Sequence, residues 1–131
     1  MAIAKSQYRS RRINAAIDGG FKRIGRRPRK AEKDALKREL GKIWDAGINR
    51  PCFLCLETNL VPSKAAFCHD IALAAGGEHV AGNIFLGCGR CNRAMRTLSV
   101  AEYLALQKAV IEAIGEPKWR KVRAWLAGSR Y

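Results

Sequence analysis

Apolar residues recur with helical spacing at the start of the chain. In the first stretch the recurring positions are Tyr8, Ile13, Ala16 and Ile17. Gly19 and Gly20 follow directly and are expected to stop this helix. A second helix is predicted over residues 31–46, with Gly47 placed to end it as a left-handed cap. The apolar stripe of that helix, which we assign to the core, consists of Leu36, Leu40, Ile43 and Trp44.

The middle of the chain has the shorter apolar runs of a β-hairpin. Residues 66–73 are predicted to form its first strand, which the Gly76–Gly77 pair breaks. Residues 84–86 form a second short apolar strand, and a helix is predicted to follow over 88–97. A basic ridge is expected along one face of that helix, where every third residue is an arginine: Arg90, Arg93 and Arg96.

The last third of the chain is helical again. Ser99 and Glu102 form a capping box at the start of a helix, which Gly115 and Pro117 are expected to end. A final helix is predicted over 118–127. Its inward positions are predicted to be Trp119, Val122 and Leu126, with Trp125 nearby. Its outward positions are predicted to be Lys118, Arg120, Lys121 and Arg123. Helices that flank a short hairpin predict an α+β fold.

The chain is strongly basic. Its 131 residues suit one domain with a modest core. Lys and Arg number 25 against 11 Asp and Glu, so the formal net charge is +14. Such an excess indicates a polyanionic partner, most plausibly nucleic acid, with a membrane surface as the weaker alternative.

The positive charge is concentrated in the first 50 residues, which hold 15 Lys or Arg and five acids. The stretch 22–30, interrupted by Gly25 and Pro28, cannot bury itself, and we expect it to be a mobile linker until phosphates neutralise it. The residues of this stretch that we expect to contact phosphates are Arg23, Arg26, Arg27, Arg29 and Lys30. The alternative is that the stretch only keeps the chain soluble. The chain therefore divides into a basic N-terminal segment, 1–30, and a single domain, 31–131.

The sequence contains no signal for a membrane or for export. No apolar run approaches the roughly 20 residues that span a bilayer. The start Met-Ala-Ile-Ala-Lys has no apolar segment behind it, so no signal peptide is expected. We therefore expect a reduced, cytoplasmic setting and no membrane partner.

Two Cys-x-x-Cys pairs predict a metal site. They are Cys52 with Cys55 and Cys88 with Cys91. Thiolates suit zinc, and two residues between ligands let one tight turn present both sulfurs to the ion. Four thiolates fill a tetrahedral shell, so this zinc would be structural. Buried thiols or disulfides are the alternative, and a cytoplasmic chain makes disulfides the weaker one.

The segment between the cysteine pairs resembles the HNH endonuclease family, the zinc-stapled ββα-metal nucleases of phages and bacterial mobile elements. That family's pattern is Asp-His-x-x-Pro-Leu-x-x-Gly-Gly, five residues, Asn-Leu, and then Cys-x-x-Cys-Asn. Here the corresponding positions are Cys68, His69, Ala72, Leu73, Gly76, Gly77, Asn83, Ile84, Cys88, Cys91 and Asn92. The spacing matches without a gap over about a third of the chain. The resemblance implies a small ββα core over 51–98, flanked by N-terminal and C-terminal helices.

The resemblance also implies roles for three residues. His69 would be the general base, because a neutral imidazole can take a proton from water near pH 7. Asn83 would hold the hairpin so that His69 points correctly. Asn92 would offer its side-chain oxygen to a catalytic Mg²⁺, Mn²⁺ or other divalent ion. The second histidine of the chain, His79, lies in the polar turn and is the weaker candidate for catalysis.

Two positions depart from the family's pattern. Cys68 stands where the family has a metal-binding Asp, and Ala72 stands where it has Pro. Asp70 is two residues beyond Cys68, and side chains two apart on a strand share a face. Either Asp70 replaces the missing carboxylate, or Cys68 binds the catalytic metal itself, or Asp70 is only a solvated strand residue.

These features predict a metal-dependent HNH endonuclease or nickase that hydrolyses DNA in the cytoplasm of a bacterial or phage-infected cell. It would bind duplex DNA mainly through the phosphate backbone. A zinc module that binds DNA or RNA with weak or no catalysis is the second interpretation, and the missing Asp supports it. An RNA substrate is compatible with the same electrostatics.

Overall fold

A computed structural model describes residues 5–128 of the chain and has the α+β fold that the sequence predicts. Residues 1–4 of the predicted basic segment and residues 129–131 of the predicted domain lie outside the described part. The helices are α1 (Lys5–Ile24), α2 (Lys30–Gly47), α3 (Gly89–Met95), α4 (Val100–Ile114) and α5 (Glu116–Leu126). The strands are β1 (Ala65–His69) and β2 (Ile84–Cys88), and the two short 3-10 helices are η1 (Leu73–Ala75) and η2 (Ala81–Asn83).

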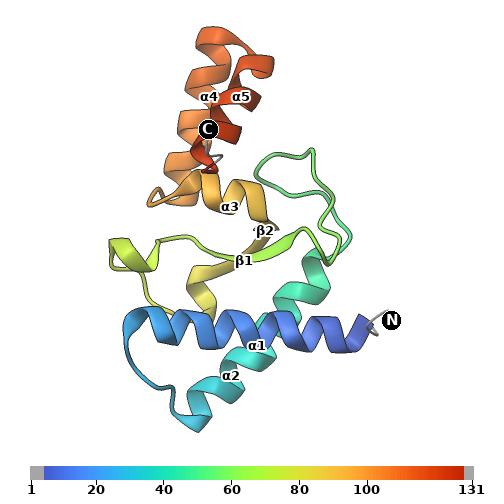
Figure 1. The fold of residues 1–131 in the computed structure, drawn as a ribbon, viewed down its shortest axis with the longest axis vertical. Coiled ribbons are helices and arrows are strands. Elements are labelled where there is room, and N and C mark those ends of the chain that lie inside the picture. Colours follow the sequence, from blue (N-terminus) through green and yellow to red (C-terminus); the bar gives the residue numbers. More distant parts are fainter. Residues whose placement is uncertain (1–4, 129–131) are drawn as a thin grey trace.

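The strands form an antiparallel hairpin at the middle of an elongated molecule (Figure 1). Ala65 pairs with Cys88 at one end of the hairpin and His69 pairs with Ile84 at the other. The crossed pair α1 and α2 lies on one side of the hairpin, and α3 with the α4–α5 pair lies on the other. The β2–α3 junction therefore lies between two helical layers.

The lower layer is built on α1, which is longer than predicted. Ile13, Ile17 and Phe21 of α1 are buried against α2 and against Ile84 of β2. The prediction that Gly19 and Gly20 stop the helix is wrong, because burial of the residues on both sides outweighs the low helix propensity of glycine. The expected linker is correspondingly shorter, since α1 ends at Ile24 and α2 begins at Lys30.

The upper layer is a second apolar cluster that includes the cysteines. Trp44, Tyr103 and Trp119 are buried in it, and Trp119 Nε1 donates a hydrogen bond to Gln107 Oε1 at 3.1 Å. The prediction that Trp125 lies near the inward stripe is wrong, since 61% of Trp125 is exposed. The face of α5 that turns inward is the one carrying Trp119 and Arg123.

Two further element ends differ from the prediction. β1 ends at His69 rather than at residue 73, because the backbone beyond it pairs with Asn83 instead of with β2. Gly47 is the last residue of α2 and not a left-handed cap; the left-handed residue is Asn49, with φ 63°. A Cβ on Gly47 would lie 3.0 Å from a methyl of Leu86, so packing accounts for this glycine.

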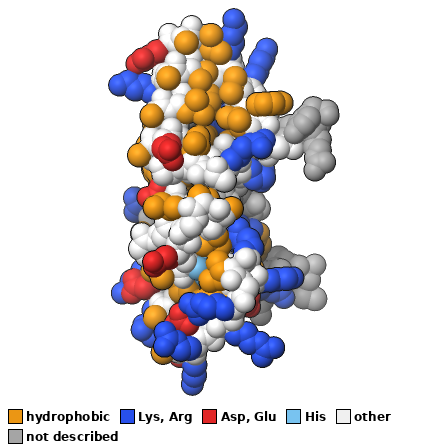
Figure 2. All heavy atoms as spheres, turned by 90° about the vertical axis from the view of Figure 1, so that its left-hand side faces the viewer, with side chains coloured by type: hydrophobic (Ala, Val, Ile, Leu, Met, Phe, Trp, Pro, Cys, Tyr) orange, Lys and Arg blue, Asp and Glu red, His pale blue; other side chains and the backbone are white. Residues whose placement is uncertain are grey.

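The capping box at the start of α4 is confirmed. Ser99 Oγ accepts a hydrogen bond from the Glu102 amide at 3.1 Å, and Glu102 Oε1 accepts one from the Ser99 amide at 2.9 Å. Beyond this start, Tyr103 is the one residue of α4 that is fully buried. Figure 2 shows hydrophobic side chains gathered on the upper half of one face of the molecule. Within residues 5–128 no helix has the length and apolar character to cross a bilayer.

Candidate functional site

The four cysteines of the two Cys-x-x-Cys pairs come together as the sequence predicts. Their Sγ atoms all lie within 4.8 Å of one another, and Cys55 Sγ is 4.0 Å from Cys88 Sγ. Zinc bound tetrahedrally at about 2.3 Å needs sulfurs about 3.8 Å apart, so the cluster can hold such an ion. All five cysteines of the chain are free thiols rather than disulfides.

Two tight turns present the sulfurs. In the loop after α2, the Cys52 amide donates to Thr58 O at 2.7 Å and the Leu56 amide donates to Cys52 O at 2.7 Å. At the β2–α3 junction, backbone amides donate to sulfur: Cys88 N to Cys52 Sγ at 3.4 Å and Cys91 N to Cys88 Sγ at 3.3 Å. Hydrogen bonds from the thiols of Cys88 and Cys91 lower the pKa of Cys52, so this thiol ionises readily.

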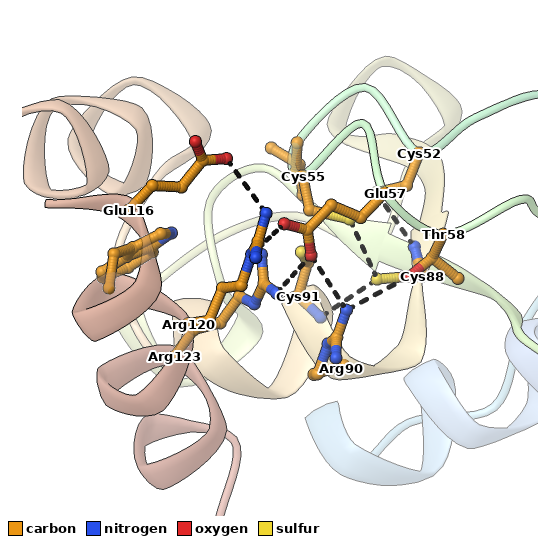
Figure 3. Close-up of polar contacts among 12 residues, drawn as sticks. Cys52, Cys55, Glu57, Thr58, Cys88, Arg90, Cys91, Glu116, Arg120 and Arg123 are labelled. Atoms are coloured by element: carbon orange, nitrogen blue, oxygen red, sulfur yellow. Dashed lines mark hydrogen bonds and ion pairs between the residues drawn. The ribbon is translucent and has the colours of Figure 1, made fainter. Parts of the chain in front are cut away.

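A cluster of arginines around Glu57 joins this loop to α5 (Figure 3). Arg120 Nε and one terminal nitrogen of Arg123 each donate to a Glu57 carboxylate oxygen at 2.6 Å. Arg90 of α3 donates to Thr58 Oγ1 at 3.2 Å and lies 3.6 Å from Glu57. The prediction that Arg123 faces outward is wrong: only 2% of it is exposed, because Glu57 supplies a partner beneath α5.

A cleft of about 530 Å³ is lined by the end of α1, the end of β1 with the segment after it, and α3 with the residues that follow it. Its polar lining residues are Arg23, His69, Asn92, Arg96 and Thr97. Its apolar lining residues are Ile24, Ala72, Leu73, Ala74 and Met95. The structure therefore brings His69 and Asn92, 23 positions apart in the sequence, to the same cavity with two arginines beside them.

A hydrogen bond joins the ring of His69 to the ring of His79. His69 Nε2 lies 2.9 Å from His79 Nδ1, and His79 Nε2 lies 3.0 Å from the carbonyl oxygen of Ile17 in α1. Burial, together with the nearby rings and charges of His79 and Arg23, lowers the pKa of His69 to about 4. Burial lowers the pKa of His79 as well. Both rings are therefore neutral near pH 7.

Sequence reasoning ranked His79 low, because no local pattern links it to His69 or to α1. Gly20 is the position at which the sequence reflects the contact between His79 and α1, because a Cβ there would lie 2.1 Å from the His79 ring. That glycine was interpreted as a helix stop. Residue 20 must be a glycine because it contacts His79, which is 59 positions away in the chain. No short stretch of the sequence includes both residues.

Asn83 ties the two ends of the hairpin loop together. Its Oδ1 accepts from the Ile71 amide at 2.8 Å, and its Nδ2 donates to the carbonyl oxygens of Ile71 and Glu78, both at 2.9 Å. The backbone around it adds a bond from the Asp70 amide to Asn83 O at 2.9 Å. These contacts fix the chain directly after His69.

The two candidates for the missing carboxylate lie elsewhere. Cys68 is a buried residue of β1, its Sγ donates to Ala66 O at 3.4 Å, and burial raises the pKa of its thiol far above the ordinary value. Asp70 Oδ1 accepts a hydrogen bond from the Val100 amide at the start of α4, at 2.8 Å. Neither residue is among the described residues that line the cleft.

The donor set of the cleft does not complete a site for a hard divalent ion. Mg²⁺ and Mn²⁺ prefer carboxylate and other oxygen ligands. Asn92 offers one amide oxygen, and the described lining residues include no Asp or Glu. A catalytic ion of the kind that the resemblance implies would need oxygen ligands that this set does not contain.

The predicted phosphate-binding residues fall into different surroundings. Arg23 and Arg96 line the cleft, while Arg26 and Arg29 contact Glu32 beside the loop between α1 and α2. The predicted ridge on α3 is interrupted, because the helix ends at Met95 and Arg96 has φ 52°. Carbonyl oxygens at the end of α5 accept from Arg93 Nε at 3.3 Å and from Arg96 Nε at 2.9 Å. The others, Arg27 and Lys30, are exposed.

Comparison of the chain with protein-family models, with curated proteins and with solved structures gives no match.

Proposed function

We propose that this protein is a DNA endonuclease or nickase of the HNH class, with a structural zinc at the four cysteines and His69 as its general base. The observation that carries the proposal is the shared cleft. Two of the three side chains to which the resemblance assigns a role, His69 and Asn92, line one cavity together with Arg23 and Arg96. A histidine, an amide and two guanidinium groups suit a phosphodiester.

The protonation state of His69 meets one requirement of this role. Hydrolysis of a phosphodiester requires a group that removes a proton from water. A base must be unprotonated to do so, and the low pKa of His69, about 4, keeps its imidazole neutral near pH 7. Removal of general-base assistance of this kind costs about 10²–10⁴-fold in rate.

The charge around the cleft supports a nucleic-acid substrate. Arg23 of α1 is exposed at the cleft, Arg26, Arg27 and Arg29 follow it on the loop to α2, and Lys30 begins α2. Figure 2 shows a histidine at the surface of the lower half of the molecule, with Lys and Arg side chains below it and to its right and acidic side chains to its left. Guanidinium groups bind phosphate oxygens without reading the base sequence, so duplex DNA would be held mainly by its backbone.

A second function, a zinc-stapled module that binds DNA or RNA with weak or no catalysis, is favoured by one observation. The described lining of the cleft has no carboxylate, while the nearby Asp70 is engaged by the amide of Val100. Without a second oxygen ligand, binding of Mg²⁺ beside His69 would be weak. The same cleft and basic surface would then bind phosphates without cutting them.

Incubation of supercoiled plasmid with the zinc-loaded protein separates the two functions. If the protein is an endonuclease, the plasmid is nicked or linearised when Mg²⁺ or Mn²⁺ is added, and the zinc-loaded protein without either ion leaves it supercoiled. His69→Ala should keep DNA binding and zinc content but lose cleavage. Lys118→Ala, which changes an exposed residue of α5, is the matched control and should cut like the native chain.

Native protein that binds plasmid but does not cut it with either ion supports the binding module instead. The same reactions with a labelled RNA hairpin test the choice of nucleic acid. Cleavage by His69→Ala within a few fold of the native rate would exclude His69 as the base.

A further inference from the structure

His79 has no part in the reaction as described so far, yet it is the residue most closely connected to His69. Only 6% of its surface is exposed. One of its ring nitrogens contacts His69 and the other contacts the backbone of α1, which is 62 positions away at Ile17. A buried histidine bonded at both nitrogens has a defined orientation, so its effect on His69 can be worked out.

The carbonyl oxygen of Ile17 determines the direction of every hydrogen bond in this chain. A carbonyl oxygen can only accept, so the hydrogen between it and His79 must be on Nε2 of His79. A neutral imidazole carries one N–H, and therefore His79 Nδ1 is bare and accepts. The hydrogen on the His69 side of the 2.9 Å contact must then be on His69 Nε2. This leaves His69 Nδ1 as the nitrogen with a free lone pair.

Neutral rings are the form that the surroundings favour. No carboxylate among the described residues is within hydrogen-bond distance of either ring, and the charged neighbours are the cations Arg23 and Arg26. Burial and neighbouring positive charge both oppose protonation of an imidazole. His69 Nδ1 has no hydrogen-bond partner in the described part of the chain, and His69 lines the cleft.

Packing on α1 keeps the His79 ring in place. The edge of the ring meets Phe21, with ring centroids 4.9 Å apart and planes at 83°. The ring occupies the space that a side chain at Gly20 would need, since a Cβ there would lie 2.1–2.4 Å from three ring atoms. The adjacent Gly19 has nothing within 4 Å of such a Cβ. Gly20 therefore forms a slot for His79, and Gly19 does not.

We propose that His79 is a positioning residue that accepts the Nε2–H of His69 and thereby presents the bare Nδ1 of His69 to the cleft. The backbone of α1 anchors it through Ile17 O, and the slot at Gly20 admits its ring. The catalytic part of this inference rests on the proposed function, because it treats His69 as the base. It makes the N-terminal helix a structural part of the reaction centre rather than only a basic arm.

The tautomer of His69 can be measured without any cleavage. In ¹⁵N-labelled, zinc-loaded native protein, long-range ¹H–¹⁵N spectra should show His69 protonated on Nε2 and bare at Nδ1. His79→Gln should keep this state, because an amide can donate to Ile17 O and accept from His69. His79→Phe keeps a ring of similar shape without either function, and should leave His69 as a mixture of tautomers. Native His69 protonated on Nδ1, or a pure Nε2–H form in His79→Phe, would overturn the proposal.

The glycine pair provides a test that leaves both histidines intact. Gly20→Ala should displace the His79 ring and give the same mixture of His69 tautomers as His79→Phe. Gly19→Ala adds the same methyl group to the same helix in open space and should keep the native spectrum. Equal spectra for the two alanine variants, with zinc content and circular dichroism unchanged, would contradict the slot at Gly20.

Cleavage assays connect the tautomer to the reaction. We expect His79→Phe and Gly20→Ala to lower the nicking rate by about 10-fold or more, and by no more than the ~10²–10⁴-fold that a general base supplies in full. DNA affinity should stay unchanged, and His79→Gln should restore most of the rate. If the native protein does not cut at all, the proposed function fails while the spectra still decide the role of His79. A native rate in His79→Phe with a changed tautomer would show that the tautomer does not matter for cleavage.

Discussion

Asp70 shows how a single contact can change the interpretation of a motif residue. Its distance of two from Cys68 suggested a substitute metal ligand, but its carboxylate accepts the amide of Val100 at 2.8 Å. That amide is one of the unpaired donors at the start of α4, where a negative charge is also favoured by the helix dipole. The contact gives Asp70 a structural role that is sufficient to account for its charge.

We therefore predict that Asp70→Ala lowers the free energy of unfolding by about 1–2 kcal/mol, the usual cost of losing a capping carboxylate. Asp70→Asn should recover most of this stability, since an amide oxygen can accept the same hydrogen bond. Chemical denaturation of the two variants measures the difference. Loss of plasmid cleavage in Asp70→Asn at native stability would instead make Asp70 a metal ligand.

His69 and His79 couple stability to pH. Folding lowers the pKa of His69 from 6.5 to about 4 and lowers that of His79 as well. Between those pH values the unfolded chain binds more protons than the folded one, so stability must fall as the pH drops. We predict a continuous loss of stability from pH 6.5 to about 4.

Thermal unfolding in excess zinc at several pH values tests this prediction. Protonation of the zinc thiolates also destabilises the protein in acid, so the comparison that matters is with His69→Gln. That variant lacks one of the two titrating groups, and its stability should depend less steeply on pH. Identical pH profiles for the native chain and the variant would contradict the prediction.

At the scale of elements, the cysteine cluster joins two segments that are more than 30 positions apart in the sequence. These are the loop after α2, which carries Cys52 and Cys55, and the β2–α3 junction, which carries Cys88 and Cys91. The ion pairs of Glu57 extend the connection to α5. Binding of zinc to such a cluster contributes directly to the free energy of folding.

We expect one zinc per chain by elemental analysis. Cys91→Ala should lose the zinc and the cooperative unfolding transition, because three thiolates no longer close the site. Cys68→Ala is the matched control: it removes the fifth cysteine, which lies outside the cluster, and should retain the zinc. A Cys91→Ala variant that melts like the native protein would refute the zinc assignment.

For the molecule as a whole, the position of α1 changes how its charge can be tested. α1 carries basic residues on its surface, but it also buries Ile13, Ile17 and Phe21 in the lower layer. Deletion of residues 1–30 would remove this part of the core together with the charge. A smaller change is needed to measure electrostatics alone.

We predict that affinity for duplex DNA falls steeply with salt, because each neutralised phosphate releases counterions. Arg27→Gln with Arg29→Gln should reduce the log–log salt slope by up to about 2, since each phosphate contact contributes about 0.9. Both residues are exposed on the loop between α1 and α2. Lys118→Gln with Lys121→Gln on α5 removes the same charge, and should change the slope less. Equal slopes for the two double variants would show that the loop is not at the interface.

Local patterns in the sequence were sufficient for three of the helices and for the cysteine cluster. Helical periodicity located α2, α4 and α5 to within a few residues, the capping box placed the start of α4, and two Cys-x-x-Cys turns defined the metal cluster. Each of these signals acts over a few neighbouring residues. Propensity, capping and tight turns depend on the same short range, so they can be recognised without knowing the fold.

Only the tertiary structure decided which distant groups meet. Because Ile17 and Phe21 are buried, α1 continues past Gly19 and Gly20. The ring of His79 packs against Gly20. Glu57, in the loop that carries Cys52 and Cys55, forms an ion pair with Arg123, which is buried. In both cases the partners are more than 55 positions apart, and the favourable energy exists only after the layers have packed. A short stretch of sequence contains only one residue of each pair. Without its partner, Gly20 is predicted to end a helix and Arg123 is predicted to be exposed.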